Sequence, residues 1–236
     1  MEKLIGKRSP VSKKGVIWSI INYFVGYNFV YPIIAILLSM AIFDFEGIAP
    51  IFSWIIYIGM LAITLQALFP YIRESWDNFI KRLGANLVSV IGYTIMLLVV
   101  SIVTSAFVSN IVGPDQSINQ QGVELMTKSE PWQMFFAIVI FAPVVEELLF
   151  RGCFYRSLSS KISLRNAAII SALLFGMIHI LEGILTLNLR DMSYILVYGS
   201  MGLLFVKVYD DTQSIIPCIL VHSLYNAVSF LMMMLL

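Results

Sequence analysis

Seven apolar runs alternate with short polar segments along this chain of 236 residues. A helix needs roughly 20 residues to cross the hydrocarbon core of a bilayer, so each run predicts a membrane span. The first run is too long for a cleaved signal peptide and is expected to be retained. The sixth is short and contains Gly199 and Gly202, small residues that permit close contact between helices. The predicted spans are 16–43, 51–69, 85–112, 132–150, 167–181, 193–206 and 215–236.

The basic residues between these runs predict the orientation of the spans. Inner loops of membrane proteins carry an excess of lysine and arginine. Placing the N-terminus inside assigns 13 of the 15 basic residues to inner segments and leaves only Lys128 and Arg190 outside. An odd number of spans then puts the C-terminus outside. The inner residues are Lys3, Lys7, Arg8, Lys13, Lys14, Arg73, Lys81, Arg82, Arg151, Arg156, Lys161, Arg165 and Lys207.

The composition agrees with a chain that lies mostly in lipid. Hydrophobic residues make up 59% of the chain and charged residues 12%, whereas soluble domains carry about 25% charged residues. The net charge is +1 and no basic stripe with interleaved aromatics occurs, so no nucleic-acid partner is expected. Cys153 and Cys218 show neither zinc-type spacing nor a disulfide framework. We therefore predict an all-α, polytopic transmembrane bundle of about seven spans in the cell membrane, with the lipid bilayer as a partner.

Ionisable side chains inside the predicted spans gather in the C-terminal half. One charge at the centre of a membrane helix costs roughly 2.5–3.5 kcal/mol, so such residues usually face the bundle interior and serve a function. Glu146 and Glu147 close the fourth span, and both histidines of the chain, His179 and His222, lie within later spans. The first three spans hold only scattered uncharged polar residues. The C-terminal half is therefore the expected place of any chemistry.

Each of these residues also has a simple structural interpretation. Glu147 and Arg151, four residues apart, share a helix face and can form an ion pair that only supports the fold. A single intramembrane histidine often makes a hydrogen bond between helices, Asn226 can join helices in the same way, and Phe175 can serve packing alone. Two carboxylates, two imidazoles, a guanidinium and a carboxamide on three helices favour a chemical site over separate structural roles.

Three motifs follow one another along these helices. They are EExxxR with Glu146, Glu147 and Arg151, FxxxH with Phe175 and His179, and HxxxN with His222 and Asn226. In this combination the chain resembles the CPBP family, which comprises type II CAAX prenyl proteases and bacteriocin-processing or immunity proteins, also named Abi proteins. The resemblance begins near Trp132. We therefore divide the chain into an N-terminal part, residues 1–131, and a catalytic core, residues 132–236.

The resemblance implies an intramembrane endopeptidase whose site opens toward the cytosolic side. By position, Glu146 is implied to activate water and His179 to hold it, while His222 and Asn226 stabilise the oxyanion. The implied substrate is a membrane-associated peptide, such as a leader, a pheromone precursor or a lipidated tail. The family was first described as metal-dependent, and a metal-free glutamate mechanism has also been proposed. The residues implied to support the site are Glu147, Arg151 and Phe175.

Both versions of the chemistry are physically reasonable. A carboxylate at its ordinary pKa of about 4.3 is a weak base, but burial raises the pKa of a carboxyl, which suits proton exchange with water. One oxyanion donor can contribute about 2.7–4 kcal/mol. Alternatively, Glu146, His179 and His222 match a known ligand set for catalytic zinc. The HExxH pattern is absent, and adjacent residues diverge by about 100° on a helix, so both glutamates cannot easily reach one ion. We favour a metal-free or weakly metal-dependent site, with a zinc centre as the alternative.

Two other functions are compatible with the sequence. A catalytically silent immunity or regulatory protein that binds a toxin or a sensor kinase could keep the same residues. Chains of glutamate and histidine also build proton relays in transporters. The transporter is disfavoured because the sequence shows no inverted repeat and no pair of broken helices in matching halves.

The depths of the two histidines set a geometric condition on the fold. His179 lies 16 residues beyond Ser163, about 24 Å along a helix, whereas His222 lies eight residues beyond Ser214, about 12 Å. The two side chains can meet only if the helices tilt strongly or the inner ends lie at different depths. We therefore expect the fourth helix to continue inward over residues 152–163.

Overall fold

The computed structural model describes residues 11–235, so Lys3, Lys7 and Arg8 of the orientation argument lie outside the described residues. Within this range the chain is almost entirely helical and has no strand. Segments labelled η are π-helical, with hydrogen bonds that reach back five residues. The elements are α1 (Lys13–Ile21), η2 (Asn22–Val30), α2 (Tyr31–Phe43), α3 (Pro50–Ala67), α4 (Phe69–Lys81), α5 (Leu83–Val112), α6 (Ile118–Ser129), α7 (Pro131–Phe135), η3 (Phe136–Phe141), α8 (Ala142–Glu147), η4 (Leu148–Tyr155), α9 (Arg156–Ser159), α10 (Leu164–His179), α11 (Leu181–Leu185), α12 (Leu189–Met192), α13 (Ile195–Thr212) and α14 (Ile215–Leu235).

Six helical stretches of the described chain are long and apolar enough to cross a membrane, and α10 is apolar but shorter. This confirms the predicted fold class, a multi-pass membrane protein with about seven spans. The six long stretches are Lys13–Phe43, Pro50–Ala67, Leu83–Val112, Pro131–Ser159, Leu189–Thr212 and Ile215–Leu235.

The expected length of the sixth span is wrong. It covers Leu189–Thr212, 24 residues, and the short helix is α10, with 16 residues. The polar residues that shortened the predicted run have partners in the folded chain. Lys207 donates to Asp211 at 2.5 Å, and Asp191 accepts the backbone N–H of Ile118 at 2.7 Å. Because these contacts offset the cost of polar groups in a span, hydropathy alone ended the helix too early.

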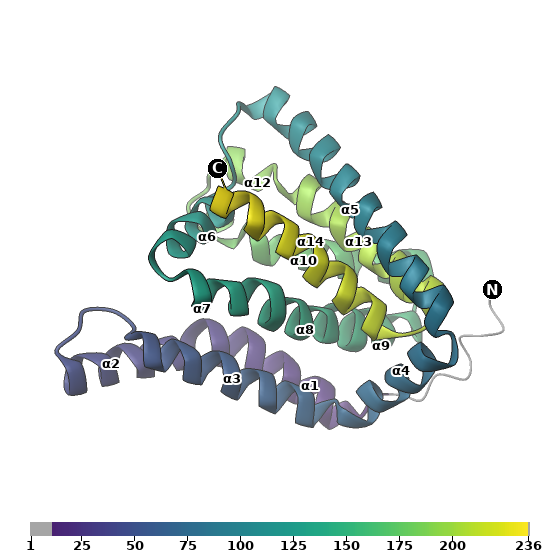
Figure 1. Ribbon diagram of the computed structural model, residues 1–236, viewed down its shortest axis with the longest axis horizontal. Coiled ribbons are helices and arrows are strands. Elements are labelled where there is room, and N and C mark those ends of the chain that lie inside the picture. Colours follow the sequence, from purple (N-terminus) through teal and green to yellow (C-terminus); the bar gives the residue numbers. More distant parts are fainter. Residues whose placement is uncertain (1–10, 236) are drawn as a thin grey trace. The chain divides into compact units, whose positions relative to one another are not determined.

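Residues up to Arg73 belong to one compact unit, which holds the first two spans. The helix of α1, η2 and α2 runs without a break, and α3 packs back along it as a hairpin (Figure 1). Asp44, with a left-handed φ of 51°, ends α2 at the turn. A Cβ atom on Gly15 would lie 2.6 Å from the carbonyl oxygen of Ala67. Glycine therefore permits the close approach of α1 to the end of α3.

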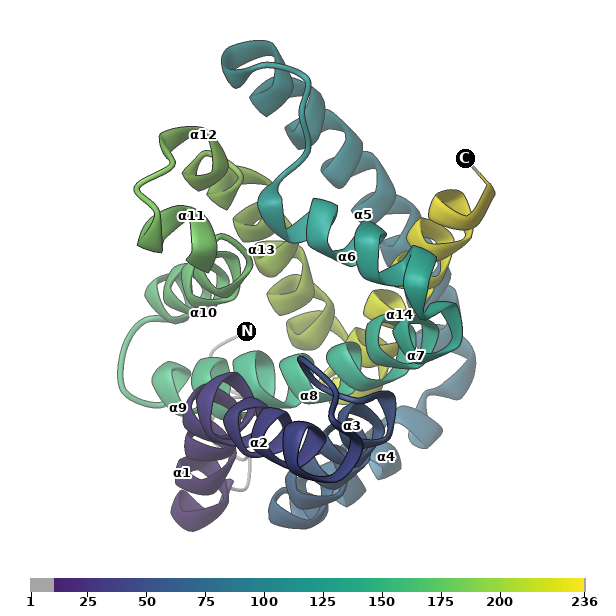
Figure 2. The same cartoon turned by 90° about the vertical axis from the view of Figure 1, so that its left-hand side faces the viewer.

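The second compact unit begins at Glu74 and carries every predicted site residue. In it α13 lies between α10 and α5, and α14 also packs on α5 (Figure 2). A Cβ atom on Gly202 of α13 would lie 2.9 Å from Cα of Ala172, and one on Gly176 of α10 would lie 3.2 Å from the backbone nitrogen of Gly199. The small residues of the sixth span thus permit close helix contact within the chain, against α10.

The fourth helix continues inward beyond the predicted span, as the different distances of His179 and His222 from their helix ends require. The helix runs to Ser159, so Glu146 lies 13 residues, about 20 Å, from its inner end. His179 lies 15 residues from the start of α10, about 22 Å, whereas His222 lies eight residues from Ser214, about 12 Å. The three side chains lie close together, and the path along the helix from His179 to the turn between α9 and α10 is roughly 10 Å longer than the path from His222 to the turn between α13 and α14.

The predicted division at residue 131 follows the start of the family motifs and stays a prediction. The compact units divide instead between Arg73 and Glu74. The third span explains this difference, because α5 packs on α13 and α14, the helices that carry the C-terminal motifs.

Candidate active site

The two glutamates lie on α8, a short α-helical stretch between the π-helical segments η3 and η4. In the register of η3, the N–H of Ala142 donates to the carbonyl of Ala137, five residues back. The next bond in that register would join residue 143 to Ile138. Pro143 has no N–H and cannot make it. The proline thus leaves the Ile138 carbonyl available to a side chain from another helix.

Asn226 of α14 supplies the missing partner. Its Nδ2 donates to the Ile138 carbonyl oxygen at 2.8 Å. On the other side of α8, Ser171 of α10 donates to the Phe150 carbonyl oxygen within η4, also at 2.8 Å. Side chains of two neighbouring spans therefore bind the irregular turns on both sides of the glutamates and fix the rotation of α8 about its axis. The Asn226 amide has a second N–H for a further acceptor.

Glu147 is fully buried and holds two partners on one oxygen. Its Oε1 accepts from Arg151 Nη1 at 3.0 Å and lies 2.9 Å from His222 Nδ1. Because a carboxylate only accepts, His222 carries a proton on Nδ1. Arg151, also fully buried, donates its Nη2 to the Gly202 carbonyl at 3.0 Å. The predicted ion pair is present, and it joins the fourth helix to α13 and α14.

Aromatic rings enclose the Arg151 guanidinium. Its Cζ atom lies 4.7 Å from the ring centroid of Phe175 and 4.8 Å from that of Phe205, within the cation–π range. Phe175 also contacts both histidines, with centroid distances of 4.5 Å to His179 and 6.0 Å to His222. Phe175 therefore lies at the centre of the cluster and touches a member of each motif.

Glu146 points away from this ion pair, toward α10. Its Oε2 lies 3.9 Å from His179 Nε2, too far for a direct hydrogen bond. The same oxygen is buried and finds no hydrogen-bond partner between residues 11 and 235. His179 Nδ1 lies 2.8 Å from the Phe175 carbonyl oxygen. Since buried polar atoms rarely lack a partner, we expect a water molecule or a polar substrate atom to bind the Oε2 atom of Glu146.

The sequence reasoning missed two aromatic residues of α13. Tyr198 stacks on His179 with ring centroids 4.5 Å apart, and its hydroxyl lies 2.8 Å from Ser117 Oγ. Phe205 stacks on His222 at 4.7 Å. The two residues are seven positions apart, two helical turns, so they share one face. That spacing was visible in the sequence, but aromatic residues at helical spacing do not by themselves indicate a site.

The residues implied as zinc ligands do not form a ligand set in this arrangement. Glu146 faces His179, while His222 directs Nδ1 to Glu147. Across the described residues, no three side chains of His, Cys, Asp or Glu lie close enough together to hold one ion. Glu146 and His179 offer two ligands, one fewer than catalytic zinc sites provide. As placed, these side chains do not fit a zinc centre, and we derive no step through one.

The part of the chain that carries the site is similar to known proteins. Residues 128–228 match the family model described as type II CAAX prenyl endopeptidase Rce1-like. The Bacillus subtilis protein named "Putative membrane peptidase YdiL" is 26% identical over 111 residues, which cover 47% of this chain and 41% of that protein. UPF0177 protein YaiF of Lactococcus lactis is 30% identical over 144 residues, 60% of this chain and 59% of that protein. The chain thus spans about half the length of these curated relatives. No solved structure matches it.

The matched segment starts within α6 and ends beyond Asn226, so it contains all three motifs. The resemblance that these motifs indicated is thereby confirmed, because the segment that carries them matches the model of the Rce1-like, type II CAAX prenyl endopeptidase family.

Proposed function

We propose that this protein is an intramembrane endopeptidase that cleaves a membrane-associated peptide with a water molecule held between Glu146 and His179. One observation carries the proposal. The buried Oε2 of Glu146 lacks a hydrogen-bond partner among the described residues and lies 3.9 Å from His179 Nε2. A water molecule there would satisfy both atoms. The similarity to a family of endopeptidases and to a relative named as a membrane peptidase supports this reading.

The geometry suits a water molecule that donates one hydrogen bond to Glu146 and one to His179. The Phe175 carbonyl can only accept, so His179 carries its proton on Nδ1, and Nε2 of the neutral ring is an acceptor. A water oxygen about 2.8 Å from both Nε2 and Oε2 would subtend an angle of about 90° between them. That angle is compatible with the two O–H bonds of one water. The lone pairs of the water oxygen would then face away from the protein, toward a peptide carbonyl.

Glu146 would take one proton from this water molecule while the water oxygen forms a bond to the carbonyl carbon of the peptide. The same carboxyl group would then pass the proton to the leaving amine when the C–N bond breaks. His179 would orient the water and keep its own Nδ1 proton throughout. Glu146 would thus act as the general base, and His179 would position the water molecule.

His222 and Asn226 would stabilise the negative oxygen of the tetrahedral intermediate. Nδ1 of His222 faces Glu147, so a donation to the oxyanion would come from Nε2 of the doubly protonated ring. Asn226 would use the amide N–H that is not bonded to Ile138. Donors of this kind each contribute about 2.7–4 kcal/mol to transition-state stabilisation.

Glu147 and Arg151 would support the site without touching the substrate. Glu147 orients His222 through the 2.9 Å contact, and Arg151 supplies the positive charge that a buried carboxylate requires. Phe175 would hold both histidine rings and, through its carbonyl, fix the tautomer of His179.

The test replaces Glu146→Gln and follows membrane-associated peptides in cells by mass spectrometry, at matched protein levels. Glutamine keeps the size of the side chain but cannot take a proton from water, so we expect specific peptide products to disappear. Glu182→Gln is the matched control, because Glu182 is exposed on α11. If every product persists in Glu146→Gln and also in His179→Ala, hydrolysis is not the function, and a non-catalytic immunity or regulatory role leads.

A further inference from the structure

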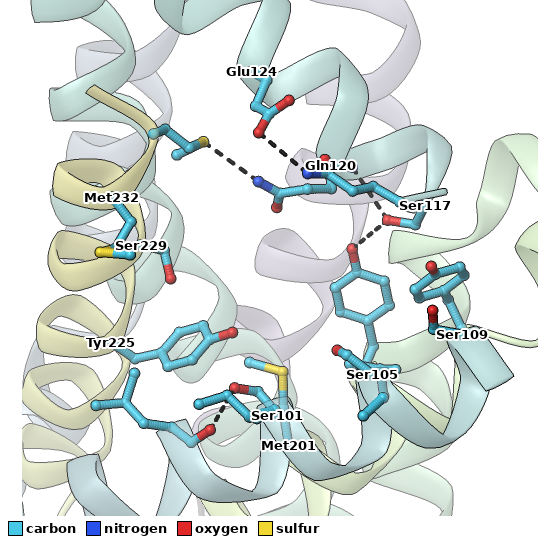
Figure 3. Close-up of a pocket in the computed structure, with 18 of the residues that line it drawn as sticks. Ser101, Ser105, Ser109, Ser117, Gln120, Glu124, Met201, Tyr225, Ser229 and Met232 are labelled. Atoms are coloured by element: carbon cyan, nitrogen blue, oxygen red, sulfur yellow. Dashed lines mark hydrogen bonds between the residues drawn. The ribbon is translucent and has the colours of Figure 1, made fainter. Parts of the chain in front are cut away.

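A large cleft lies in the second unit, apart from the glutamates and histidines of the proposed active site. It has a volume of about 980 Å³ and is lined by residues of α5, α6, α13 and α14 and of the segment before α6. The outer loop that contains α6 is predicted to face the outside. Figure 3 shows hydroxyl and carboxamide groups from several of these elements around the open space. A volume near 1,000 Å³ is at the upper end of the range for ligand pockets.

Hydroxyl groups line two opposite walls of the cleft. Ser105 and Ser109 lie on α5, and Tyr225 and Ser229 lie on α14 (Figure 3). None of these four hydroxyls forms a hydrogen bond that the structure records within residues 11–235, and all four side chains are only partly buried. Polar groups at membrane depth require a partner because lipid offers none. The cleft therefore suits a polar ligand or water better than an acyl chain.

The serines of α5 are spaced like the polar groups of an extended peptide. Ser101, Ser105 and Ser109 follow at every fourth residue, so their hydroxyls recur about every 6 Å along the helix axis. An extended peptide repeats its backbone groups on one side every two residues, about 6.8 Å. The lining of α5 from Leu98 to Ser109 is about 17 Å long, which matches roughly five extended residues.

Apolar side chains alternate with these hydroxyls around the cleft. Met201 of α13 and Val228 and Met232 of α14 contribute apolar surface to the same space. Glu124 and Lys128 of α6 add one charge of each sign. This mixture fits an uncharged or weakly charged peptide segment, whose backbone needs hydrogen bonds and whose side chains need apolar contact.

Tyr198 connects the cleft to the proposed active site. Its side chain lines the cleft, its ring stacks on His179 with centroids 4.5 Å apart, and its hydroxyl contacts Ser117, the residue that caps α6. A ligand in the cleft would therefore touch the ring that stacks on His179. Tyr198 thus contacts both the cleft and the histidine of the proposed active site.

We propose that the cleft binds an extended segment of about five residues from the peptide substrate, remote from the scissile bond, and that Tyr198 is a positioning residue between this segment and His179. The proposal rests on the proposed peptidase function for the identity of its ligand. It adds a subsite in which hydroxyls of α5 and α14 bind the peptide backbone.

The first experiment identifies what occupies the cleft. The photoreactive residue p-benzoylphenylalanine replaces Ser105 or, on the opposite wall, Ser229, each in the Glu146→Gln background, and cells are irradiated. Val103 is the matched control, because it lies on α5 with 60% exposure and does not line the cleft. We expect peptide adducts at both cleft positions, severalfold above those at Val103, when adducts are identified by mass spectrometry. Phospholipid adducts alone, no adducts, or equal yields at Val103 would overturn the proposal.

The second experiment separates binding from positioning. Ser109→Leu fills the cleft and should raise the KM for the identified peptide about tenfold with little change in kcat, since it removes a remote binding contact. Tyr198→Phe keeps the ring but loses the contact with Ser117, and should lower kcat with little change in KM. Loss of protein accumulation in place of these kinetic changes would indicate a purely structural role for Tyr198.

The outcomes distinguish this inference from the proposed function. Peptide adducts in the cleft combined with unchanged products in Glu146→Gln would overturn hydrolysis and leave a peptide-binding protein. Loss of products in Glu146→Gln combined with no peptide adducts at Ser105 and Ser229 would support the peptidase and overturn the cleft as its subsite.

Discussion

Removal of the Arg151 side chain should destabilise the protein more than any single surface change. Arg151→Met keeps much of the side-chain volume but removes the hydrogen bonds to Glu147 and to the Gly202 carbonyl, both 3.0 Å long. It also removes the cation–π contacts with two phenylalanine rings. Glu147 would then be fully buried without the guanidinium that balances its charge. Breaking a buried ion pair in this way costs about 3–5 kcal/mol.

A double-mutant cycle isolates the interaction from the loss of each side chain. Glu147→Gln alone leaves a buried guanidinium with a neutral neighbour, whereas the double variant removes both charges. We expect the double variant to be less destabilised than the sum of the two single variants, with a coupling energy within the range of about 0.5–3 kcal/mol for residues in contact. Equilibrium unfolding in mixed detergent micelles, followed by the helical circular dichroism signal, measures the free energies of unfolding.

Arg165→Met is the control for this cycle. Arg165 lies at the exposed start of α10, so its substitution should change the free energy of unfolding by no more than about 0.5 kcal/mol. A cost for Arg151→Met equal to that of the control would refute the reasoning. Strict additivity of the two single variants would refute it as well, because it would mean that Glu147 and Arg151 do not stabilise one another.

Two further predictions concern individual contacts, and a third concerns the metal. Gly202→Ala should lower the free energy of unfolding by about 1–3 kcal/mol, since the new Cβ would lie 2.9 Å from Cα of Ala172; Gly199→Ala, which meets no atom within 4 Å, should not destabilise the protein in the same unfolding assay. Asn226→Leu should cost about 1–3 kcal/mol because it leaves the Ile138 carbonyl without its 2.8 Å bond, and wild-type stability in that assay would contradict this account. Incubation of the purified enzyme with a strong zinc chelator should leave peptide cleavage unchanged, whereas a loss of cleavage that zinc alone restores would show that the metal is required.

The sequence predicts the membrane helices and the candidate site residues, but it does not predict which residues those side chains contact. Hydropathy located all seven apolar segments because each span must satisfy its backbone internally. It failed at the length of the sixth span, which has 24 residues. Lys207, Asp211 and Asp191 interrupt the apolar pattern of the sixth, and only their contacts in the folded chain show that the helix continues through them.

The roles of the site residues depend on long-range contacts that the spacing of the motif residues does not predict. The motif predicts that Glu147 and Arg151 share a face, and this pair is present. It does not predict that His222 joins the pair, or that Asn226 bonds to Ile138, because both contacts join residues more than 70 positions apart. The second contact also depends on the π-helical register next to Pro143, which changes the partner of one carbonyl. Tyr198 lacked any distinguishing sequence signal.

The adjacency of the two glutamates would explain how the proposed site holds both a structural and a reactive carboxylate. Neighbouring residues on a helix point about 100° apart, so the two side chains enter different environments although their backbones touch. Glu147 contacts Arg151 and His222 through Oε1, and the guanidinium balances its charge, although its buried Oε2 also has no hydrogen-bond partner among the described residues. Glu146 Oε2 lies 3.9 Å from His179 Nε2 and has no hydrogen-bond partner among the described residues. The balanced carboxylate holds the three helices in register. The other carboxylate is thereby fixed in a buried position where its best available partner is a molecule from outside the chain, which is the arrangement that a hydrolytic water requires.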